Sequence, residues 1–288
     1  MKIRIAKTSG FCFGVNRAVK IVDNLLTDGK KVCTLGPIIH NSVVTKNFKE
    51  RGAVVVEAPS FVPKEAVLVV RSHGVTKSTI DFIKSKNIDY IDATCPFVKK
   101  IHNIVAKNSS DGNNILLVAG NKNHPEMIGI RSYFNGVSYT FKDVIELKEI
   151  VKNHSNLINH SIIMVAQTTF SVKEWKKCVD FSTKVFTKIR FFDTICNTTS
   201  LRQEEALILS KNSDLMVVIG GKNSSNTHKL YDICSENAKT IWVEDINDLQ
   251  KMDFFHYENI SITAGASTPV SLVEQVYEFI KNSVSKST

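Results

Sequence analysis

Three cysteines stand where a strand-like segment gives way to a helix-like one. Cys12 follows the apolar alternation of Ile3 and Ile5, and the apolar spacing of residues 15–26 predicts a helix directly after it. Cys95 and Cys196 occupy the same kind of junction, in the stretches YIDATCP and FFDTICN. Helix starts favour the thiolate form of cysteine, and thiolates bind soft metals. We therefore expect chemistry at these three junctions.

The number and spacing of these cysteines favour an iron–sulfur centre over a structural zinc. Zinc usually takes four ligands, often in closely spaced pairs, whereas these cysteines lie 83 and 101 residues apart. A four-iron cluster held by three cysteines would leave one iron open to a substrate oxygen. The remaining cysteines sit in apolar strand or helix patterns and are predicted to be small buried hydrophobes: Cys33, Cys178 and Cys234.

Strand-like and helix-like segments alternate along the whole chain. Strands are predicted over residues 32–35, 53–56, 66–71 and 88–91, and helices over 42–51 and 77–86. Such alternation indicates parallel sheets covered by helices, so the predicted fold class is α/β.

The same plan recurs three times. A glycine and a polar loop follow a strand about thirty residues after each cysteine, at residues 36–41, 120–126 and 220–226, and a second polar loop ends a later strand, at 71–74, 166–169 and 264–267. Ligands bind beyond the carboxyl ends of parallel strands. We therefore expect three α/β lobes, over residues 1–94, 95–194 and 195–288, in a pseudo-threefold arrangement around one polar pocket with three cysteines in its wall.

The polar loops carry mostly neutral hydrogen-bond donors, which suit phosphate oxygens at helix starts. The candidates are His40, His73, His124, Thr168, Ser224, Ser225, Asn226 and Ser267. Each alone is more often a cap or turn residue, but recurrence at matched places favours binding. Glu126 is the one carboxylate in these loops, and a helix cap after Pro125 is its alternative role. Cys95-Pro96 is predicted to cap a helix, and Ser200 with Gln203 to form a capping box.

Composition narrows the classes of partner. The chain has 43% hydrophobic and 23% charged residues, no run near 18 apolar residues and no secretory signal pattern, so we expect a cytoplasmic protein with no membrane segment. Its formal charge of +9 is scattered and matches no nucleic-acid motif. An acidic protein or a phosphorylated substrate fits that charge, as does a solvated basic surface. No Walker or Gly-x-Gly-x-x-Gly motif appears, which favours electrons from a protein carrier over a nicotinamide.

Nine motifs, in order, closely resemble the 4-hydroxy-3-methylbut-2-enyl diphosphate reductase family (IspH, also called LytB). They are SGFCFGV at 9–15, LGPIIHN at 35–41, RSHGV at 71–75, DATCP at 92–96, NHPE at 123–126, AQTT at 166–169, DTIC at 193–196, GGKNSSNT at 220–227 and TAGASTP at 263–269. The resemblance runs from residue 3 to about residue 279.

This resemblance implies the last step of the non-mevalonate isoprenoid pathway, a reductive removal of an allylic hydroxyl that yields isopentenyl and dimethylallyl diphosphate. It implies that Cys12, Cys95 and Cys196 hold a 4Fe-4S cluster with one open iron. It further implies a catalytic role in proton delivery for Glu126, with Thr168 at the substrate hydroxyl. The diphosphate would lie among His40, His73, His124, Ser224, Asn226 and Ser267, with Ser225 beside them. Ferredoxin or flavodoxin would deliver the electrons.

Two other functions remain open from the sequence. A redox-neutral hydro-lyase of the quinolinate-synthase type would use the cluster as a Lewis acid and need no reductant. A non-catalytic iron–sulfur sensor would need no polar pocket, and the recurring polar loops speak against it.

Overall fold

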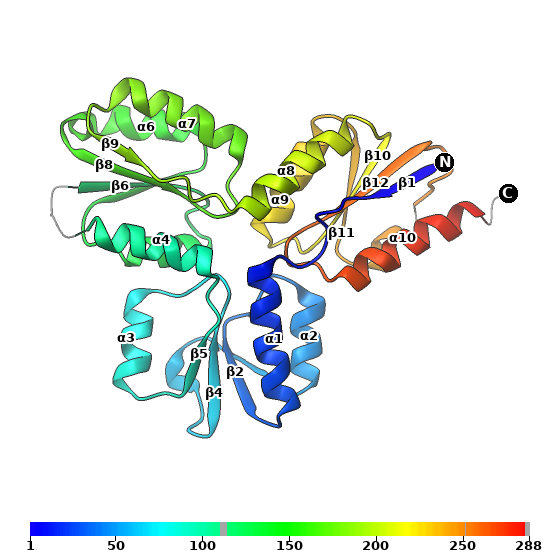
Figure 1. The fold of residues 1–288 in the computed structure, drawn as a ribbon, viewed down its shortest axis with the longest axis horizontal. Helices are drawn as coiled ribbons and strands as arrows, with labels where there is room; N and C mark the ends of the chain where they lie inside the picture. Colours follow the sequence, from blue (N-terminus) through cyan, green and yellow to red (C-terminus); the bar gives the residue numbers. More distant parts are fainter. Residues whose placement is uncertain (110–113, 251, 286–288) are drawn as a thin grey trace. The chain divides into compact units, whose positions relative to one another are not determined.

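The computed structural model describes residues 1–109, 114–250 and 252–285. Within these residues the chain forms three four-stranded sheets, termed sheets A, B and C, and the strands of each sheet run parallel (Figure 1). Helices cover the sheets, so the predicted three-lobed α/β class is confirmed.

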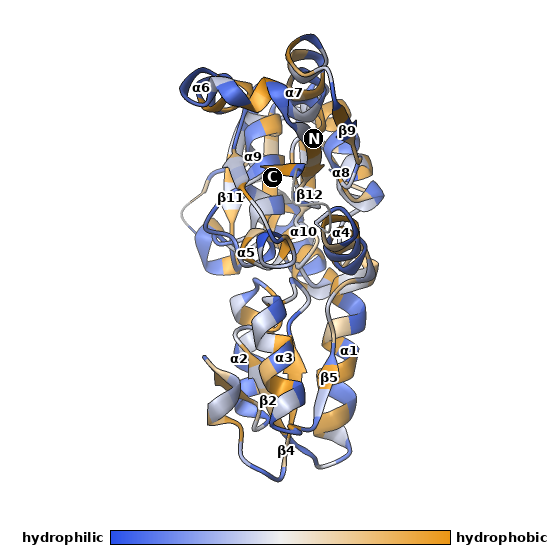
Figure 2. Ribbon diagram, turned by 90° about the vertical axis from the view of Figure 1, so that its left-hand side faces the viewer, coloured by the Kyte–Doolittle hydropathy of each residue, from blue (hydrophilic) through white to orange (hydrophobic). Residues whose placement is uncertain are grey.

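Sheet B is built from the first third of the chain. Its strands, from one edge to the other, are β3 (Val54–Val56), β2 (Lys31–Leu35), β4 (Ala66–Val70) and β5 (Tyr90–Asp92). Its helices are α1 (Phe13–Thr27), α2 (Ser42–Glu50) and α3 (Lys77–Ser85), with a short turn η1 (Pro59–Phe61). Hydrophobic and hydrophilic residues alternate along α1 (Figure 2), as expected of an amphipathic helix with one buried side.

Sheet C follows in the middle of the chain. Its strands in order are β7 (Ser138–Phe141), β6 (Asn114–Ala119), β8 (Ser161–Ala166) and β9 (Ile189–Phe191). Its helices are α4 (Pro96–Lys107), α5 (Pro125–Ser132), α6 (Val144–Asn153) and α7 (Val172–Val185), with a turn η2 (Ser155–Asn159). Successive residues of β6 face opposite layers: Leu117 packs in the same core as Trp175 of α7, and Leu116 in the core of Ile101 and Met127.

Sheet A combines the last third of the chain with its first strand. Its strands in order are β11 (Lys239–Val243), β10 (Leu215–Ile219), β12 (Asn259–Ala264) and β1 (Lys2–Ile5). Its helices are α8 (Asn197–Ser210), α9 (Ser225–Ser235) and α10 (Val270–Ser285), with a turn η3 (Ile246–Leu249). Val276 of α10 shares a core with Val217, whereas Val218 packs with Leu230 of α9 on the other face.

The three sheets share one strand order. The chain begins with β1, which takes the place of the fourth strand in sheet A, whose other strands come from the last third of the chain. In each, the second strand of the repeat forms one edge, followed by the first, third and fourth. The fourth strands β5 and β9 precede Cys95 and Cys196, and β1 plays the same part before Cys12. The sequence limits 1–94 assign β1 to the first lobe, whereas its partner is β12. The lobe limits otherwise stay a prediction.

Contacts divide the chain into two compact units. Unit A comprises residues 1–16, 40–44 and 197–288 and contains sheet A; unit BC comprises residues 17–39 and 45–196 and contains sheets B and C. None of the helices in the described part of the chain has both the length and the apolarity to cross a membrane.

Candidate active site

The predicted site residues divide equally between the two units. Unit BC holds His73, Cys95, His124, Glu126, Thr168 and Cys196, and unit A holds Cys12, His40, Ser224, Ser225, Asn226 and Ser267. Most of them lie in loops after strands, as the sequence predicts, whereas Glu126 lies in the first turn of α5, and Ser225 and Asn226 lie in the first turn of α9.

Glu126 is the most deeply buried of the predicted polar residues in unit BC. It lies in the first turn of α5, is 1% exposed, and its carboxylate accepts two hydrogen bonds from one residue after β8. The backbone N–H of Thr168 donates to Oε1 at 2.7 Å, and the Thr168 hydroxyl donates to Oε2 at 2.9 Å. The helix cap is supplied by His124 instead, so the carboxylate of Glu126 points across to the neighbouring strand end rather than capping its own helix.

Burial decides the protonation of this carboxyl group. Removal from water raises the pKa of Glu126 to about 7, although the two hydrogen bonds from Thr168 act in the opposite direction by favouring the charged form. A carboxyl group with a pKa near neutrality can hold a proton and release it at physiological pH, which is the property required of a general acid.

Two histidines of unit BC lie edge to face. The rings of His73 and His124 have centroids 5.3 Å apart and an interplanar angle of 85°. Nδ1 of His124 accepts the backbone N–H of Glu126 at 3.1 Å, so Nδ1 carries no proton and the neutral ring keeps its proton on Nε2. His124 can therefore donate a hydrogen bond from Nε2 to an anionic oxygen.

The junction cysteines are anchored to the second polar loop of each repeat in the same way. The N–H of Cys95 donates to the carbonyl of Ser72 at 2.9 Å, and that of Cys196 to Thr168 at 3.0 Å, both in unit BC. In unit A the N–H of Cys12 donates to Ala266 at 3.0 Å. This shared bond is the structural form of the repeat seen in the sequence.

The six cysteines form two classes. Cys12, Cys95 and Cys196 are half-buried and stand directly before α1, α4 and α8, and Cys95 is the cap of α4 with Pro96 in its first turn, as predicted. The other three are fully buried, which confirms their predicted structural role, and burial raises each thiol pKa, to about 12 in two of them: Cys33, Cys178 and Cys234. Only the first class suits soft-metal ligation, because thiolate is the ligating form.

In unit A, the start of α9 offers polar groups to a ligand. Ser224 caps the helix by accepting the N–H of Thr227 at 3.3 Å, which leaves its hydroxyl proton able to donate elsewhere. Asn226 is 4% exposed, and among the described residues neither Nδ2 nor Oδ1 has a hydrogen-bond partner. A buried amide without partners is costly, so this helix start is suited to receive a polar ligand.

Ser267 and His40 meet within unit A through a backbone group. The Ser267 hydroxyl donates to the carbonyl oxygen of His40 at 3.1 Å. A Cβ atom at Gly221 would lie 3.0 Å from that same oxygen, so the glycine allows the close backbone approach that the Gly220-Gly221 pair predicts.

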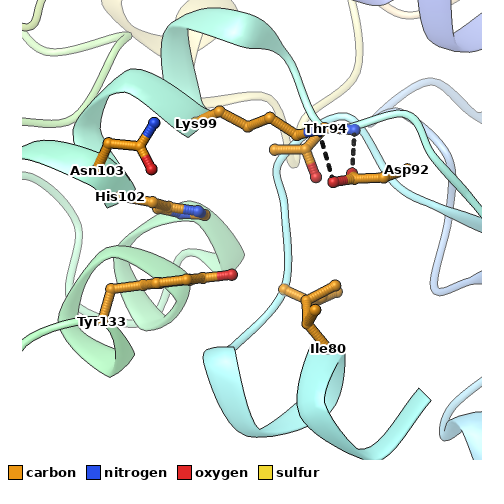
Figure 3. A pocket seen from close by; sticks show the side chains of 8 residues that line it. Ile80, Asp92, Thr94, Lys99, His102, Asn103 and Tyr133 are labelled. Carbon is orange, nitrogen blue, oxygen red and sulfur yellow. Dashed lines mark hydrogen bonds and ion pairs between the residues drawn. The ribbon is translucent and has the colours of Figure 1, made fainter. Parts of the chain in front are cut away.

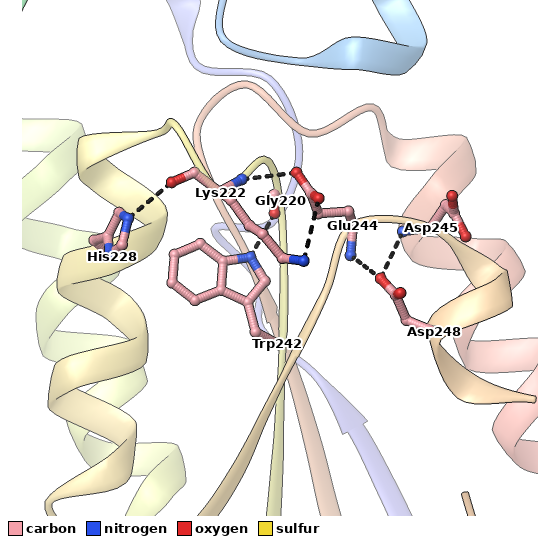
Figure 4. A network of polar contacts seen from close by, with 7 residues as sticks. All are labelled: Gly220, Lys222, His228, Trp242, Glu244, Asp245 and Asp248. Carbon is pink, nitrogen blue, oxygen red and sulfur yellow. Dashed lines mark hydrogen bonds and ion pairs between the residues drawn. The ribbon is translucent and has the colours of Figure 1, made fainter. Parts of the chain in front are cut away.

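A network outside the loop fixes residues 220–222 (Figure 4). Nε1 of Trp242 donates to the carbonyl of Gly220 at 2.6 Å, and Glu244 accepts the N–H of Lys222 at 2.8 Å. The N–H of Glu244 in turn donates to Asp248 at 2.7 Å. No role for Trp242 or Glu244 was predicted from the sequence, because each lies 22 residues from the loop residue that it binds and belongs to no recurring motif.

One local prediction is wrong. Ser200 does not start a capping box with Gln203, because α8 already begins at Asn197 and both side chains lie inside it. Cys196, tied to the strand end by its backbone, takes the position before the helix.

The chain is similar along nearly its whole length to reductases from several bacteria. It is 42% identical over 282 residues to the 4-hydroxy-3-methylbut-2-enyl diphosphate reductase of Campylobacter hominis, which covers 97% of this chain and 98% of that one. It is 41% identical to the reductase of the same name from a Thermoanaerobacter species, over 98% and 97% of the two chains.

Two solved structures of reductases are also similar to this chain. The structure of (E)-4-hydroxy-3-methyl-but-2-enyl diphosphate reductase, the terminal enzyme of the non-mevalonate pathway, matches with a TM-score of 0.70 and 35% identity over 98% of this chain and 100% of that chain. The Plasmodium falciparum E-1-hydroxy-2-methyl-but-2-enyl-4-diphosphate reductase matches with 0.89 and 27%, over 96% and 87%. The family described as LytB protein matches residues 3–281, and this chain belongs to it.

Proposed function

We propose that this chain is an iron–sulfur reductase that converts 4-hydroxy-3-methylbut-2-enyl diphosphate to isopentenyl and dimethylallyl diphosphate. The substrate takes up two electrons and two protons, its allylic C–O bond breaks, a C–H bond forms and water leaves. Membership of the LytB family supports this reaction. The observation that carries the chemistry is a buried carboxyl group, Glu126, held between the N–H and the hydroxyl of Thr168.

The donor set fits the cofactor. Cys12, Cys95 and Cys196 are half-buried and placed directly before helices, whereas the other cysteines are buried in cores. These three would hold a 4Fe-4S cluster, which when bound supplies electrons and an open iron that acts as a Lewis acid toward the hydroxyl oxygen.

Polar side chains of the recurring loops would hold the diphosphate. His124 can donate from Nε2 and Ser224 from its hydroxyl, and Nδ2 of Asn226 is a buried donor at the start of α9. His40, His73, Ser225 and Ser267 complete the proposed set. The Ser267 proton points to the His40 carbonyl, so Ser267 needs a hydroxyl rotation before it donates to phosphate.

Glu126 would supply a proton to the leaving oxygen. Hydroxide is a poor leaving group, and general acids typically contribute about 10² to 10⁴ in rate. Thr168 keeps the carboxyl group in one orientation through its two hydrogen bonds, and its side chain would contact the substrate hydroxyl.

The electron donor would be a ferredoxin or flavodoxin. The net charge of +9 supports an acidic carrier, whose approach electrostatic attraction would accelerate. Reduction by such a carrier should then slow as ionic strength rises; a salt-insensitive rate would count against this choice.

The direct test is reoxidation of dithionite-reduced methyl viologen by anaerobically reconstituted protein, with and without the substrate. Substrate-dependent oxidation that yields the two five-carbon diphosphates is the expected result. An intact cluster with no oxidation would refute the reductase and leave the redox-neutral lyase.

The ligand assignment has its own test. Cys196→Ser should lose most of the bound iron, because an alcohol is a poor ligand for this centre, whereas the matched Cys234→Ala change in a buried core should retain it. Iron analysis after reconstitution measures both, and full iron content in Cys196→Ser would disprove the ligand role.

A further inference from the structure

Two arginines hold the chain segments that lead into the proposed ligand cysteines. Arg17 of α1 donates from Nη2 to the carbonyl of Asp92 at 3.0 Å and from Nη1 to that of Thr94 at 3.3 Å, just before Cys95. Arg202 of α8, 3% exposed, donates from Nη2 to the carbonyl of Gly10 at 2.7 Å, two residues before Cys12. Each guanidinium thus donates to two backbone carbonyl oxygens.

The two contacts follow one rule along the chain. Arg17 lies five residues after Cys12 and grips the segment of Cys95, and Arg202 lies six residues after Cys196 and grips the segment of Cys12. The second oxygen bound by Arg202 is the carbonyl of Ala264, at 3.0 Å and at the end of β12. A helix that starts at one cysteine therefore carries the arginine that holds another.

The segment before Cys95 is fixed further by charged groups around Asp92 (Figure 3). The carboxylate of Asp92 accepts the N–H of Thr94 at 2.9 Å and pairs with the Lys99 ammonium at 2.7 Å. Burial would raise the pKa of Asp92, but the bonds from Lys99 and Thr94 outweigh it and hold that pKa below its usual value. The carboxylate is therefore charged, and both its side chain and its carbonyl are used to shape this turn.

The segment before Cys12 contains a glycine, Gly10, with a positive φ angle, and Arg202 binds the carbonyl of this residue. Gly10 has φ +106°, and a Cβ atom there would lie 2.7 Å from Cγ2 of Val270. Glu205, one turn beyond Arg202 on α8, accepts the backbone N–H groups of Lys7 and Thr8 at 2.7 and 2.8 Å. One helix thus binds the chain at residues 7, 8 and 10, shortly before Cys12.

The segment before Cys196 is not held by an arginine of the helix that follows Cys95. The helix α4 contains no arginine, and its residue six positions after Cys95 is the core residue Ile101. The Cys196 segment is instead tied by Thr194, whose hydroxyl donates to the carbonyl of Ala166 at 2.6 Å.

We propose that Arg17 and Arg202 are positioning residues that set the geometry and the electron affinity of the iron–sulfur centre by fixing the segments of Cys95 and Cys12. The inference rests on the proposed cluster. Guanidinium provides a rigid fork that binds two oxygens at once, and its positive charge beside an anionic centre favours electron uptake. Lysine keeps the charge without the fork, and glutamine removes the charge, so the two effects are separable.

The test uses the reconstituted full chain with Arg17→Lys, Arg17→Gln and Arg202→Lys, and exposed Arg190→Lys as the matched control. Cluster loss is followed by absorbance under chelator challenge, and the midpoint potential by redox titration. Both lysine variants should lose the cluster about tenfold faster than wild type, the effect of one charge-assisted hydrogen bond. Arg17→Gln should in addition shift the potential to a more negative value, while Arg17→Lys keeps it.

The outcomes separate this proposal from the proposed function. Wild-type protein that retains no iron would overturn both. Wild-type protein with a stable cluster, together with arginine variants that match Arg190→Lys in cluster loss and potential, would overturn the positioning role alone. So would faster cluster loss accompanied by an equal fall in the thermal stability of the metal-free protein, because that result is general destabilisation. Arg17 is only half-buried, so its variants keep the proposal testable if Arg202→Lys fails to fold.

Discussion

Two buried polar side chains, Glu126 of unit BC and Asn226 of unit A, differ in how far the protein itself satisfies their hydrogen bonds. In unit BC both oxygens of Glu126 are bonded to Thr168, and the N–H of Glu126 is bonded to His124. In unit A the amide of Asn226 is equally buried yet makes no hydrogen bond within the described residues. The surroundings of Glu126 are therefore organised to hold a proton before any ligand binds. The amide of Asn226 obtains hydrogen-bond partners only when a ligand binds.

The largest effect on turnover should come from a change at Glu126 in unit BC. Glu126→Gln keeps the shape and the contact with the Thr168 N–H but removes the transferable proton, so turnover should fall by about 10² to 10⁴. Substrate binding and iron content should stay near wild type, as measured by viologen oxidation, calorimetry and iron analysis. Exposed Glu57→Gln is the control. Near-normal turnover in Glu126→Gln would refute the role in proton delivery.

A change at Asn226 in unit A should weaken substrate binding more than it slows turnover. Asn226→Leu removes a donor that would face phosphate, so KM should rise about ten- to a hundredfold with a smaller change in kcat. The same change removes a buried amide without partners, so the free energy of unfolding of the ligand-free protein should rise by about 1 kcal/mol. Exposed Asn223→Leu is the control, with kinetics and urea unfolding as measurements. Unchanged KM would contradict a binding role.

The contrast also marks what the sequence could and could not predict. The loops, the junction cysteines and the cap at Cys95-Pro96 depend on short patterns, because strand and helix periods and cap chemistry are local. The pairing of β1 with β12 joins Lys2 to Asn259, a contact that no local pattern encodes. The repeat alone points to this pairing, since among the described residues no strand follows Ala264 to match β5 and β9.

Side-chain partners were harder to predict than loop positions. The sequence pattern placed Glu126 in the first polar loop of the middle third and Thr168 in the second, but the two bonds between them need the register of β6 against β8. Arg17 and Arg202 look like solvated charges in a basic chain, and their carbonyl partners lie 62 or more residues away in sequence. Residues that recur in each third can be predicted from the sequence pattern. Residues that belong to no repeat and act through long-range contacts cannot.

The raised pKa of Glu126 has a consequence for stability in unit BC. The folded protein holds this proton more tightly than the unfolded chain, so its contribution is fully present below about 4.5 and is lost as pH rises through about 7. The free energy of unfolding should fall by up to about 3 kcal/mol more across this range in wild type than in Glu126→Gln. Urea unfolding of the metal-free protein at several pH values measures it. Parallel curves for the two proteins would show that Glu126 has an ordinary pKa.

The smallest effect should come from the single side-chain bond between the two residues of unit BC. Thr168→Val keeps the backbone N–H bond to Oε1 but removes the hydroxyl bond to Oε2, which lowers the pKa of Glu126. The pKa should therefore rise further, and the fall of kcat/KM at high pH, which reports the acid in the free enzyme, should move to higher pH by about one unit or less. Exposed Thr183→Val should leave the profile in place. A shift to lower pH in Thr168→Val would mean that the hydroxyl stabilises the protonated carboxyl group, and that Thr168 donates its proton to the substrate rather than to Glu126.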